Sequence, residues 1–246
     1  MQQPFSQDIL LQTSMVDVNG RWQPGSIFRV MQEVSGAHAE GFGLGRQPLM
    51  DAGIAWVLTR ASLQMDEYPC YGQTVTVKTW PTKGRHAFFP RHYTFEVDGR
   101  EIGRSTTLYV LMDIAERKMA HPSRLPGQLP EYDIPAPLPT PGAIALPDSE
   151  PVNSIHAVRY TDLDFNGHVN NTRYMDWFAD CFDWQEHQHM ELAEATVHYL
   201  QEIRPGEQVK LQLRREGNVA VLQGEAEGVQ RFQLKGMWRE RKGLMT

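Results

Sequence analysis

The sequence contains no long apolar run. No stretch approaches the roughly 20 consecutive apolar residues that a membrane-spanning helix needs, although 41% of the 246 residues are hydrophobic and six are Trp. This material can fill a core, so we expect a soluble globular protein. At roughly 100 to 200 residues per domain, the length suits one large or two small domains.

The N-terminal residues lack the features of a targeting segment. They have no basic stretch followed by an apolar one, and they are not rich in Arg and Ser. Neither a secretory signal nor a transit peptide is therefore expected. We expect a cytoplasmic protein without a membrane partner.

Cysteine is scarce. Cys70 and Cys181 lie far apart and in no metal-type spacing. In a cytosolic chain such a pair is more typical of small buried apolar residues than of a disulfide. No role is assigned to either residue, and no cofactor is expected.

Positive charge is also in deficit. The net charge of −6 argues against a nucleic-acid partner, whose phosphates require broad neutralisation. The C-terminal residues 200–246 differ, because they carry nine Lys or Arg against six Asp or Glu. This bias suits either a solvated strand surface or a docking patch for an acidic partner. Its basic residues are Arg204, Lys210, Arg214, Arg215, Arg231, Lys235, Arg239, Arg241 and Lys242.

Proline is concentrated in one segment. Nine of the 16 prolines lie in residues 121–151, where each fixes φ and removes a backbone donor. The segment predicts a stiff, extended linker. It separates an N-terminal domain, residues 1–120, from a C-terminal domain, residues 152–246.

The two domains share a sequence pattern. "DVNGRWQPGSIFRVM" from Asp17 aligns with "DFNGHVNNTRYMDWF" from Asp164 at an offset of 147 residues. "LQMDEYPCYGQTVTV" from Leu63 aligns with "VHYLQEIRPGEQVKL" from Val197 at an offset of 134. Two matches in the same order, on either side of a linker, indicate an internal duplication.

Each copy is expected to contain one long helix. In the first copy Ile27, Val30, Met31 and Val34 form an apolar stripe after Pro24, and the helix should end near Gly41. In the second copy, Asn170 or Asn171 is expected to cap a helix. Its stripe contains Tyr174, Trp177, Phe178, Cys181 and Phe182.

Strand patterns follow each helix. Alternating residues with short polar turns predict antiparallel strands starting at Thr74, Arg91, Arg104, Glu207, Val219 and Val229. Each copy is then an α+β unit in which a sheet wraps around a helix.

Asp164, Asn166 and His168 form a candidate catalytic set. In an extended segment, residues two apart point to one side, and the following helix N-terminus would add N–H donors. A carboxylate, an amide and an imidazole suit attack on a carbonyl group. Two alternatives remain: an Asx-rich turn before a capped helix, and a metal site, which would have only two strong ligands.

Several segments together resemble the acyl carrier protein thioesterase family. "DLDFNGHVNNTRYMDW" is similar to the family's D-x-N-x-H-V-N-N segment, "FRVMQEVSGAHAEGFGL" to its first helix, and "MDEYPCYGQTVTVKTW" to the strands that follow. The resemblance runs nearly the full length of the chain. It implies a tandem hotdog fold, in agreement with the duplication.

The resemblance also implies residue roles. It makes Asp164, Asn166, His168 and Glu202 catalytic. Asp164 and Glu202 are candidates either for activating water or for attacking directly as a nucleophile that forms a covalent anhydride. Ile203 departs from the pattern, because some members carry a Cys there, so a mechanism that uses this thiol as nucleophile is excluded.

The first copy has Arg21 and Tyr68 in place of His168 and Glu202. The first half is therefore expected to be non-catalytic, and the resemblance implies that it houses the acyl chain.

The implied function is hydrolysis of fatty acyl-acyl carrier protein to free fatty acid. The partner is then an acyl carrier protein, and a homodimer is one allowed assembly. The alternatives are an acyl-CoA thioesterase and a non-catalytic acyl-binding module.

Overall fold

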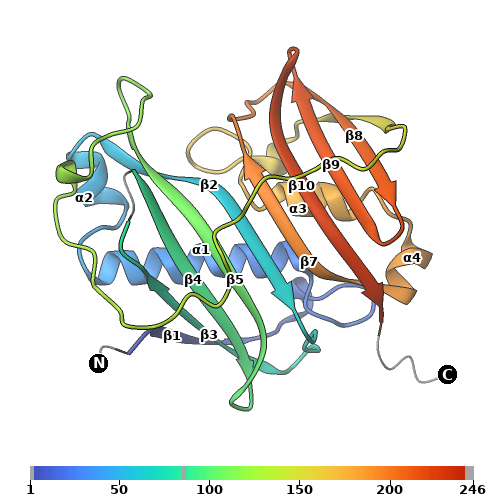
Figure 1. Cartoon of the computed structure of the whole chain (residues 1–246), viewed down its shortest axis with the longest axis horizontal. Helices are drawn as coiled ribbons and strands as arrows, with labels where there is room; N and C mark the ends of the chain where they lie inside the picture. Colours follow the sequence, from blue (N-terminus) through green and yellow to red (C-terminus); the bar gives the residue numbers. More distant parts are fainter. Residues whose placement is uncertain (1–2, 85–86, 242–246) are drawn as a thin grey trace. The chain divides into compact units, whose positions relative to one another are not determined.

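The structure, a computed structural model, describes residues 3–84 and 87–241. The chain divides into two compact units, the first reaching Pro141 and the second beginning at Gly142. Each unit contains five antiparallel strands and a helix that packs against them (Figure 1). This is the expected α+β tandem hotdog arrangement, and the two units are described separately below.

The first unit has the strand order β1-β3-β4-β5-β2. Every pair in this order is antiparallel. The strands are β1 (Phe5–Leu10), β2 (Ile54–Met65), β3 (Thr74–Pro81), β4 (Phe88–Val97) and β5 (Arg100–Asp113). The helices are α1 (Pro24–Gly41) and α2 (Arg46–Asp51), with short 3-10 turns at Thr13–Met15 and Pro122–Arg124.

The second unit repeats this order as β6-β8-β9-β10-β7. Its strands are β6 (Val152–Ala157), β7 (Met190–Tyr199), β8 (Gln208–Glu216), β9 (Val219–Ala226) and β10 (Val229–Glu240). Its helices are α3 (Arg173–Ala179) and α4 (Trp184–His189), with a 3-10 turn at Tyr160–Asp162. The identical strand order agrees with the internal duplication inferred from the sequence.

The duplication extends to single hydrogen bonds. The Trp22 N–H donates to the Pro69 carbonyl at 2.9 Å, and the Val169 N–H donates to the Ile203 carbonyl at 2.8 Å. These partners are related by the offsets of 147 and 134 residues seen in the sequence. Both alignments therefore describe equivalent positions in space within each unit.

Helix α1 matches its prediction. It begins at Pro24 and ends at Gly41, because Pro is favourable in the first helical turn and has no N–H to lose. The expected stripe faces the interior, where all four of its residues are buried: Ile27, Val30, Met31 and Val34.

The second helix is shorter than expected. Tyr174, Trp177 and Phe178 are buried on α3, but the helix ends at Ala179, so Cys181 and Phe182 lie beyond it. A new helix, α4, starts after Asp183, whose carboxylate accepts the Glu186 N–H at 2.8 Å. This cap satisfies a donor that a continuous helix would have bonded internally.

The expected cap of α3 is also different. Thr172 occupies the N-cap position and makes no side-chain cap bond. The Asn170 carboxamide oxygen instead accepts from the Thr172 N–H and hydroxyl, both at 2.9 Å. Asn170 thus closes the turn before the helix.

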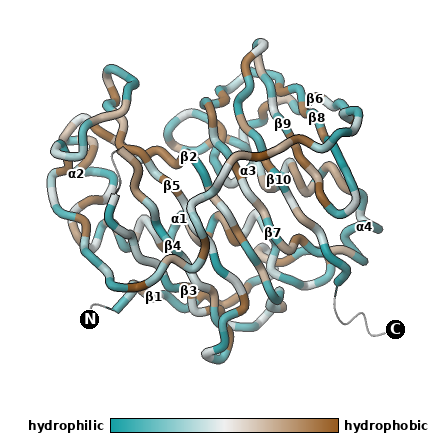
Figure 2. The backbone as a smooth tube through the Cα atoms, in the orientation of Figure 1, coloured by the Kyte–Doolittle hydropathy of each residue, from teal (hydrophilic) through white to brown (hydrophobic). Residues whose placement is uncertain are grey.

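All six predicted strands are present, whereas the short edge strands β1 and β6 and the long strands β2 and β7 were not among them. Propensity explains why β2 and β7 were missed. Their sequences, IAWVLTRASLQM and MELAEATVHY, are rich in Ala, Leu, Glu and Met, which favour helices. Sheet pairing overrides this preference, since β2 pairs with β5 and β7 pairs with β10. Along β10 buried and partly exposed residues alternate, as expected for a strand with one buried face, and Figure 2 shows hydrophobic and hydrophilic residues interspersed along the strands of the sheet.

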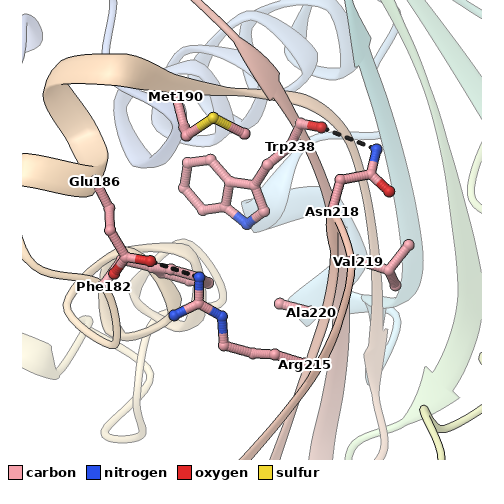
Figure 3. A pocket seen from close by; sticks show the side chains of 9 residues that line it. Phe182, Glu186, Met190, Arg215, Asn218, Val219, Ala220 and Trp238 are labelled. Atoms are coloured by element: carbon pink, nitrogen blue, oxygen red, sulfur yellow. Dashed lines mark hydrogen bonds and ion pairs between the residues drawn. The ribbon is translucent and has the colours of Figure 1, made fainter.

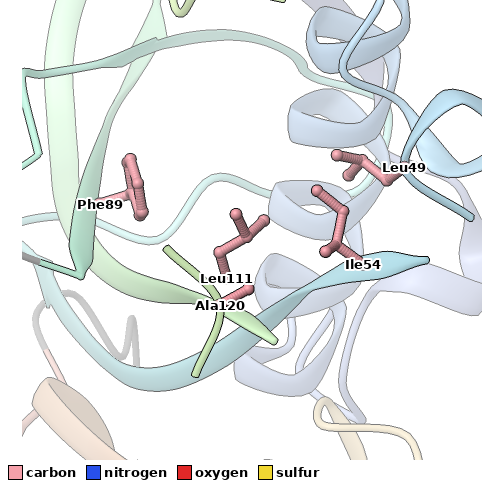
Figure 4. Close-up of a cluster of buried hydrophobic side chains, with 5 residues drawn as sticks. All are labelled: Leu49, Ile54, Phe89, Leu111 and Ala120. Carbon is pink, nitrogen blue, oxygen red and sulfur yellow. The ribbon is translucent and has the colours of Figure 1, made fainter. Parts of the chain in front are cut away.

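One apolar cluster fills an end of the first unit. It contains Leu49, Ile54, Phe89, Leu111 and Ala120 (Figure 4). The side chains come from α2, β2, β4, β5 and the residue just before the proline-rich segment, and Leu125 and Leu129 of that segment pack against the cluster. Burial of such side chains contributes roughly 1.5 to 3 kcal/mol each, so the cluster holds that segment against the sheet.

The rest of the proline-rich segment is extended. Residues 125–151 contain no helix or strand. Inside the first unit the Leu138 carbonyl accepts from the Thr106 hydroxyl at 3.0 Å, and the Pro141 carbonyl accepts from Arg60 at 2.9 Å. Side chains of the sheet thus donate to carbonyl groups of a segment whose prolines have no N–H of their own.

Both cysteines are free thiols. Cys70 is exposed, contrary to the expected burial, whereas Cys181 is half-buried and its thiol donates to the Trp177 carbonyl at 3.2 Å. Burial, with a smaller contribution from Asp180, raises the pKa of Cys181 to about 11. Among the described residues, no helix is both long and apolar enough to cross a membrane.

Candidate active site

Asp164, Asn166 and His168 share one tight turn. The Asp164 N–H donates to the His168 carbonyl at 3.0 Å, and the Gly167 N–H donates to the Asp164 carbonyl at 3.1 Å. Gly167 has φ +80°, which glycine adopts without steric cost. The segment is therefore a tight turn and not the extended strand that we expected from the sequence. The turn brings the three residues together instead.

The Asp164 carboxylate holds this turn. It accepts the Asn166 N–H at 2.8 Å, and the Asn166 side-chain amide lies 3.3 Å from its other oxygen. This is an Asx turn, so one alternative considered from the sequence is realised in the backbone. It coexists with a second role for the same carboxylate, because Asp164 also faces His168.

His168 lies between two carboxylates. Its Nδ1 is 3.9 Å from an Asp164 oxygen, and its Nε2 is 3.9 Å from a Glu202 oxygen. Both separations exceed a hydrogen bond, but catalytic contacts commonly tighten only when substrate is bound. The side chains are 14% exposed for Asp164, 24% for His168 and 34% for Glu202. The set is therefore accessible from solvent.

Glu202 is placed by the loop between β7 and β8. The Arg231 guanidinium donates to its backbone carbonyl at 3.1 Å, and the next carbonyl, that of Ile203, accepts the Val169 N–H. The loop is thus tied to the turn that carries His168. The Ile203 side chain is fully buried, so it packs in the core beside the candidate site.

The expected helix N-terminus does not serve the site. Helix α3 begins at Arg173, five positions after His168. Its first N–H groups are already bonded: that of Thr172 to the Asn170 side chain at 2.9 Å and that of Arg173 to the Asn170 carbonyl at 2.9 Å. An oxyanion formed on the substrate would therefore need hydrogen-bond donors other than these N–H groups, such as the side-chain amide of Asn166.

The first unit contains the same turn without the same chemistry. The Asp17 carboxylate accepts the Asn19 N–H at 2.8 Å, and Gly20 has φ +69°. At the position of His168, however, Arg21 points a guanidinium NH1 toward the Tyr68 carbonyl at 3.4 Å. The imidazole between two carboxylates is specific to the second unit.

Two residues near the site were missed from the sequence. Tyr174, treated there as a core aromatic, has its hydroxyl pKa raised by burial and, further, by the carboxylates of Glu207, Asp164 and Glu202, against the opposing charge of Arg231. The other is Asp162, which is 2% exposed. Its only sequence signal is the D-x-D spacing with Asp164.

A small pocket lies away from the candidate site. Phe182, Arg215, Trp238 and their neighbours enclose about 40 Å³ (Figure 3). Trp238 is seven residues along β10 from Arg231, the residue that contacts Glu202, which corresponds to roughly 23 Å at about 3.3 Å per residue. Ligand pockets usually measure roughly 300 to 1,000 Å³. This pocket is too small to hold an acyl chain.

The site has the groups that hydrolysis of an activated carbonyl requires. Asp164 can orient the imidazole, Glu202 can accept a proton from water, and His168 can pass a proton to a leaving group. The Asn166 amide can donate to the carbonyl oxygen. Among the described residues, no group of three or more His, Cys, Asp or Glu is arranged to hold a metal ion.

The chain matches two family models in the order of its units. Residues 2–123 match the acyl-ACP thioesterase N-terminal domain, and residues 147–240 match the acyl-ACP thioesterase C-terminal domain. These two ranges cover most of the sequence.

Similar proteins are found among curated sequences and solved structures. The chloroplastic acyl-[acyl-carrier-protein] hydrolase FATB3 of Cuphea viscosissima is 24% identical over 226 residues, 81% of this chain and 52% of that protein. The chloroplastic palmitoyl-acyl carrier protein thioesterase of Arabidopsis thaliana is 25% identical over 187 residues, 70% of this chain and 44% of that protein. The chain spans about half the length of the curated relatives it matches.

Solved structures agree along nearly the whole chain. An acyl-ACP thioesterase from Bacteroides thetaiotaomicron has a TM-score of 0.88 at 25% identity, covering 95% of this chain and 97% of that one. The 12:0-ACP thioesterase from Umbellularia californica has a TM-score of 0.80 at 20% identity, covering 96% and 97%, and supports the fold alone. Together with the two domain matches, these findings show that the chain belongs to the acyl-ACP thioesterase family.

Proposed function

We propose that the protein hydrolyses the thioester of a fatty acyl-acyl carrier protein, releasing a free fatty acid and the carrier thiol. The observation that carries this proposal is the imidazole of His168 between the carboxylates of Asp164 and Glu202. Family membership supplies the reaction class. The names of the relatives, hydrolases of acyl-[acyl-carrier-protein], support the choice of carrier.

In the proposed reaction, water attacks the thioester carbonyl. Glu202, the more exposed carboxylate, takes a proton from the attacking water, while Asp164 holds His168. The C–S bond breaks, the acyl group keeps the water oxygen, and protonated His168 gives the sulfur its proton. The proton that Glu202 took from water then passes to the neighbouring His168, which restores both groups. Asn166 positions the carbonyl oxygen. Each product is then complete: a carboxylic acid and a thiol.

Steady-state hydrolysis of one acyl chain on two carriers tests this function. We expect a higher kcat/KM for the acyl carrier protein thioester than for the coenzyme A thioester. Equal or faster hydrolysis of the coenzyme A substrate would make the protein an acyl-CoA thioesterase. Stoichiometric binding without release would make it an acyl-binding module.

The first unit is proposed to house the acyl chain. Val34 lies on α1 and is fully buried between this helix and the rest of the unit. We expect Val34→Phe to shift the products toward shorter fatty acids, because the larger side chain fills space that the acyl tail would occupy. Gas chromatography of the released acids measures the shift.

Overpacking alone must be separated from this effect. Inserting a larger side chain into a core costs about 1 to 3 kcal/mol wherever it is placed. Val209→Phe, at a fully buried position of β8 in the second unit, is the matched control and should leave product length unchanged. If Val34→Phe has the product profile of the wild type, the acyl chain lies elsewhere.

We do not place the docking surface on the basic C-terminal residues as a whole, because many of them already have partners. Most of the arginines are committed inside the second unit: Arg231 pairs with Glu207 at 2.7 Å, Arg239 with Glu191 at 2.7 Å and Arg215 with Glu186 at 2.5 Å. Arg214 donates to the Ser149 carbonyl and Arg241 to that of His187, while Lys242 lies outside the described residues. Reversing Arg214 and Arg215 would therefore disturb the fold.

Other cations near the site are better candidates for carrier docking. Arg159 directly precedes the 3-10 turn that leads into the site, and Lys210 lies on the first half of β8. Both are exposed, and neither forms an ion pair within the described part of the chain. They can therefore face an acidic carrier without first breaking an internal contact.

We expect Arg159→Glu combined with Lys210→Glu to lower kcat/KM on the carrier substrate about tenfold at low salt. Rim charges act mainly on association and are screened over roughly 8 Å at physiological ionic strength. Added salt should remove most of the difference, and a small synthetic thioester should be unaffected. Lys83→Glu combined with Lys118→Glu makes the same charge change in the first unit. Equal losses in both double variants would mean that net charge, not this surface, attracts the carrier.

A further inference from the structure

Asp162 is a buried carboxylate two residues before the catalytic turn. Its side chain accepts from His156 Nε2 at 2.9 Å, the Arg159 N–H at 2.9 Å, Arg173 Nε at 3.3 Å and Trp177 Nε1 at 3.4 Å. Burial alone would raise the pKa of Asp162, but the hydrogen bonds from His156, Arg159 and Arg173 outweigh burial and keep the pKa below its usual value. The group is therefore an ionised carboxylate with its acceptors occupied.

This carboxylate joins three elements of the second unit. His156 belongs to β6, Arg173 and Trp177 to α3, and Arg159 to the segment that enters the turn. The His156 ring also packs on Trp177, with ring centroids 4.2 Å apart, and Arg173 pairs with Asp176 at 2.8 Å. One anion thus fixes the helix and the strand on either side of the turn.

The main chain carries this restraint to the site. The Asn170 N–H donates to the Asp162 carbonyl at 2.9 Å, so the chain before the turn is tied to the chain after it. Between these residues lies His168, whose neighbour Val169 bonds to the loop of Glu202. The turn that carries His168 is therefore tied both to Asp162 and to the loop of Glu202.

The first unit shows that the turn does not need this carboxylate in order to fold. There the Gln23 N–H donates to the Met15 carbonyl at 3.0 Å, the equivalent of the bond from Asn170 to Asp162. Met15 stands at the position of Asp162. At the offset of 147 residues, the partners His156, Arg173 and Trp177 are replaced by Ile9, Ser26 and Val30. The same backbone turn forms in the first unit with apolar and small side chains. The polar network is therefore present only in the unit that contains His168, and the turn itself does not require it.

We infer that Asp162 is a positioning residue for the reaction: through His156, Arg173 and Trp177 it holds the catalytic turn so that His168 meets Glu202 and the substrate in reactive geometry. The inference rests on the proposed hydrolytic function of this site. Displacing a catalytic group by about 1 Å can cost 10²-fold in rate. The network therefore acts on turnover more than on substrate binding.

Asp162→Asn tests the inference, because it keeps the shape and removes the charge. We expect kcat to fall about 10- to 100-fold with KM changed less than threefold, in protein shown to be folded by circular dichroism and thermal melting. Met15→Asn places the same side chain at the equivalent position of the first unit and should keep kcat within about twofold. A kcat for Asp162→Asn within twofold of the wild type would overturn the inference.

Two further measurements separate positioning from general stabilisation. His156→Gln retains an N–H donor toward Asp162 and should keep most of the turnover, whereas His156→Leu should lose it. In a His168→Ala background, Asp162→Asn should cause no further loss, because residues that act through one group are not additive. A full additional loss, or equal activities of the two His156 variants, would contradict the positioning role. If His168→Ala alone has the wild-type rate, the assignment of the reaction to this site fails instead.

Discussion

His168→Ala and Glu202→Ala are each expected to keep the fold and to lower turnover about 10²- to 10⁴-fold, the usual cost of removing a positioned acid or base. Neither side chain is fully buried, with 24% and 34% of the side-chain surface exposed. Truncation should therefore leave no large cavity. Steady-state kcat on an acyl carrier protein thioester, measured on protein shown to be folded, gives the result.

The duplication provides matched controls for both substitutions. Arg21→Ala and Tyr68→Phe alter the equivalent positions of the first unit and should change kcat less than about threefold. Arg21→His should not create a second active site, because Tyr68 faces that position in place of a carboxylate. Near wild-type turnover in folded His168→Ala and Glu202→Ala would show that the site has been assigned to the wrong residues.

Acid is expected to destabilise the first unit through two buried histidines. His38 and His92 are 6% and 2% exposed. Burial, reinforced by the neighbouring charge of Arg91, lowers the pKa of each from 6.5 to about 4. Both imidazoles are therefore neutral in the folded protein at pH 7.

The contacts of His38 show why a proton is disfavoured there. Arg91 donates to its Nδ1 at 3.1 Å, so the other nitrogen donates to the Tyr132 hydroxyl at 2.9 Å. Arg91 is itself 7% exposed, and no carboxylate of the described residues pairs with it. His92 is held in a similar way between the hydroxyls of Thr82 and Thr106. A second proton on either ring would place two cations together without a counterion.

The expected loss follows from proton linkage. Between pH 6.5 and 4 the unfolded chain binds protons at both histidines and the folded chain does not, so the free energy of unfolding falls as the pH is lowered. At about 1.4 kcal/mol per pKa unit, each histidine contributes roughly 2 to 3 kcal/mol across this window. Urea unfolding at pH 7.0 and pH 4.5 measures the change.

Carboxylates also titrate in this range, so the comparison with variants is decisive. His38→Gln and His92→Gln should each reduce the difference in unfolding free energy between the two pH values by about 2 kcal/mol. If both variants lose as much stability on acidification as the wild type, these histidines are not the buried neutral groups that the structure indicates.

The sequence predicted the fold more fully than the site. The offsets of 147 and 134 residues located the repeat, because D-x-N-G turns and glycines at positive φ require particular residues. The length of helix α3 was overestimated, because the apolar stripe continues to Phe182. The helix ends earlier, and Asp183 caps the start of α4. Strands β2 and β7 were missed because their residues individually favour helices and only sheet pairing overrides that preference.

The site illustrates a different limit of sequence reasoning. Asp164, Asn166 and His168 do lie together, but the expected cause, an extended segment, was wrong, and the tight turn depends on Gly167. Asp162 was missed because its side-chain partners belong to β6 and α3, two elements that only packing brings to the same carboxylate. Motif spacing reveals residues that share a turn, whereas a network assembled by packing needs the tertiary structure.

A single-turnover reaction in water enriched with oxygen-18 tests the central claim most directly. Enzyme in excess over one acyl carrier protein thioester should release free fatty acid and carrier thiol in equal amounts, with one heavy oxygen in the acid. The His168→Ala/Glu202→Ala double variant should release neither product at a comparable rate. Mass spectrometry of both products gives the answer. If the wild-type protein binds the acyl carrier and leaves the thioester intact, the chain is not the hydrolase that its site indicates.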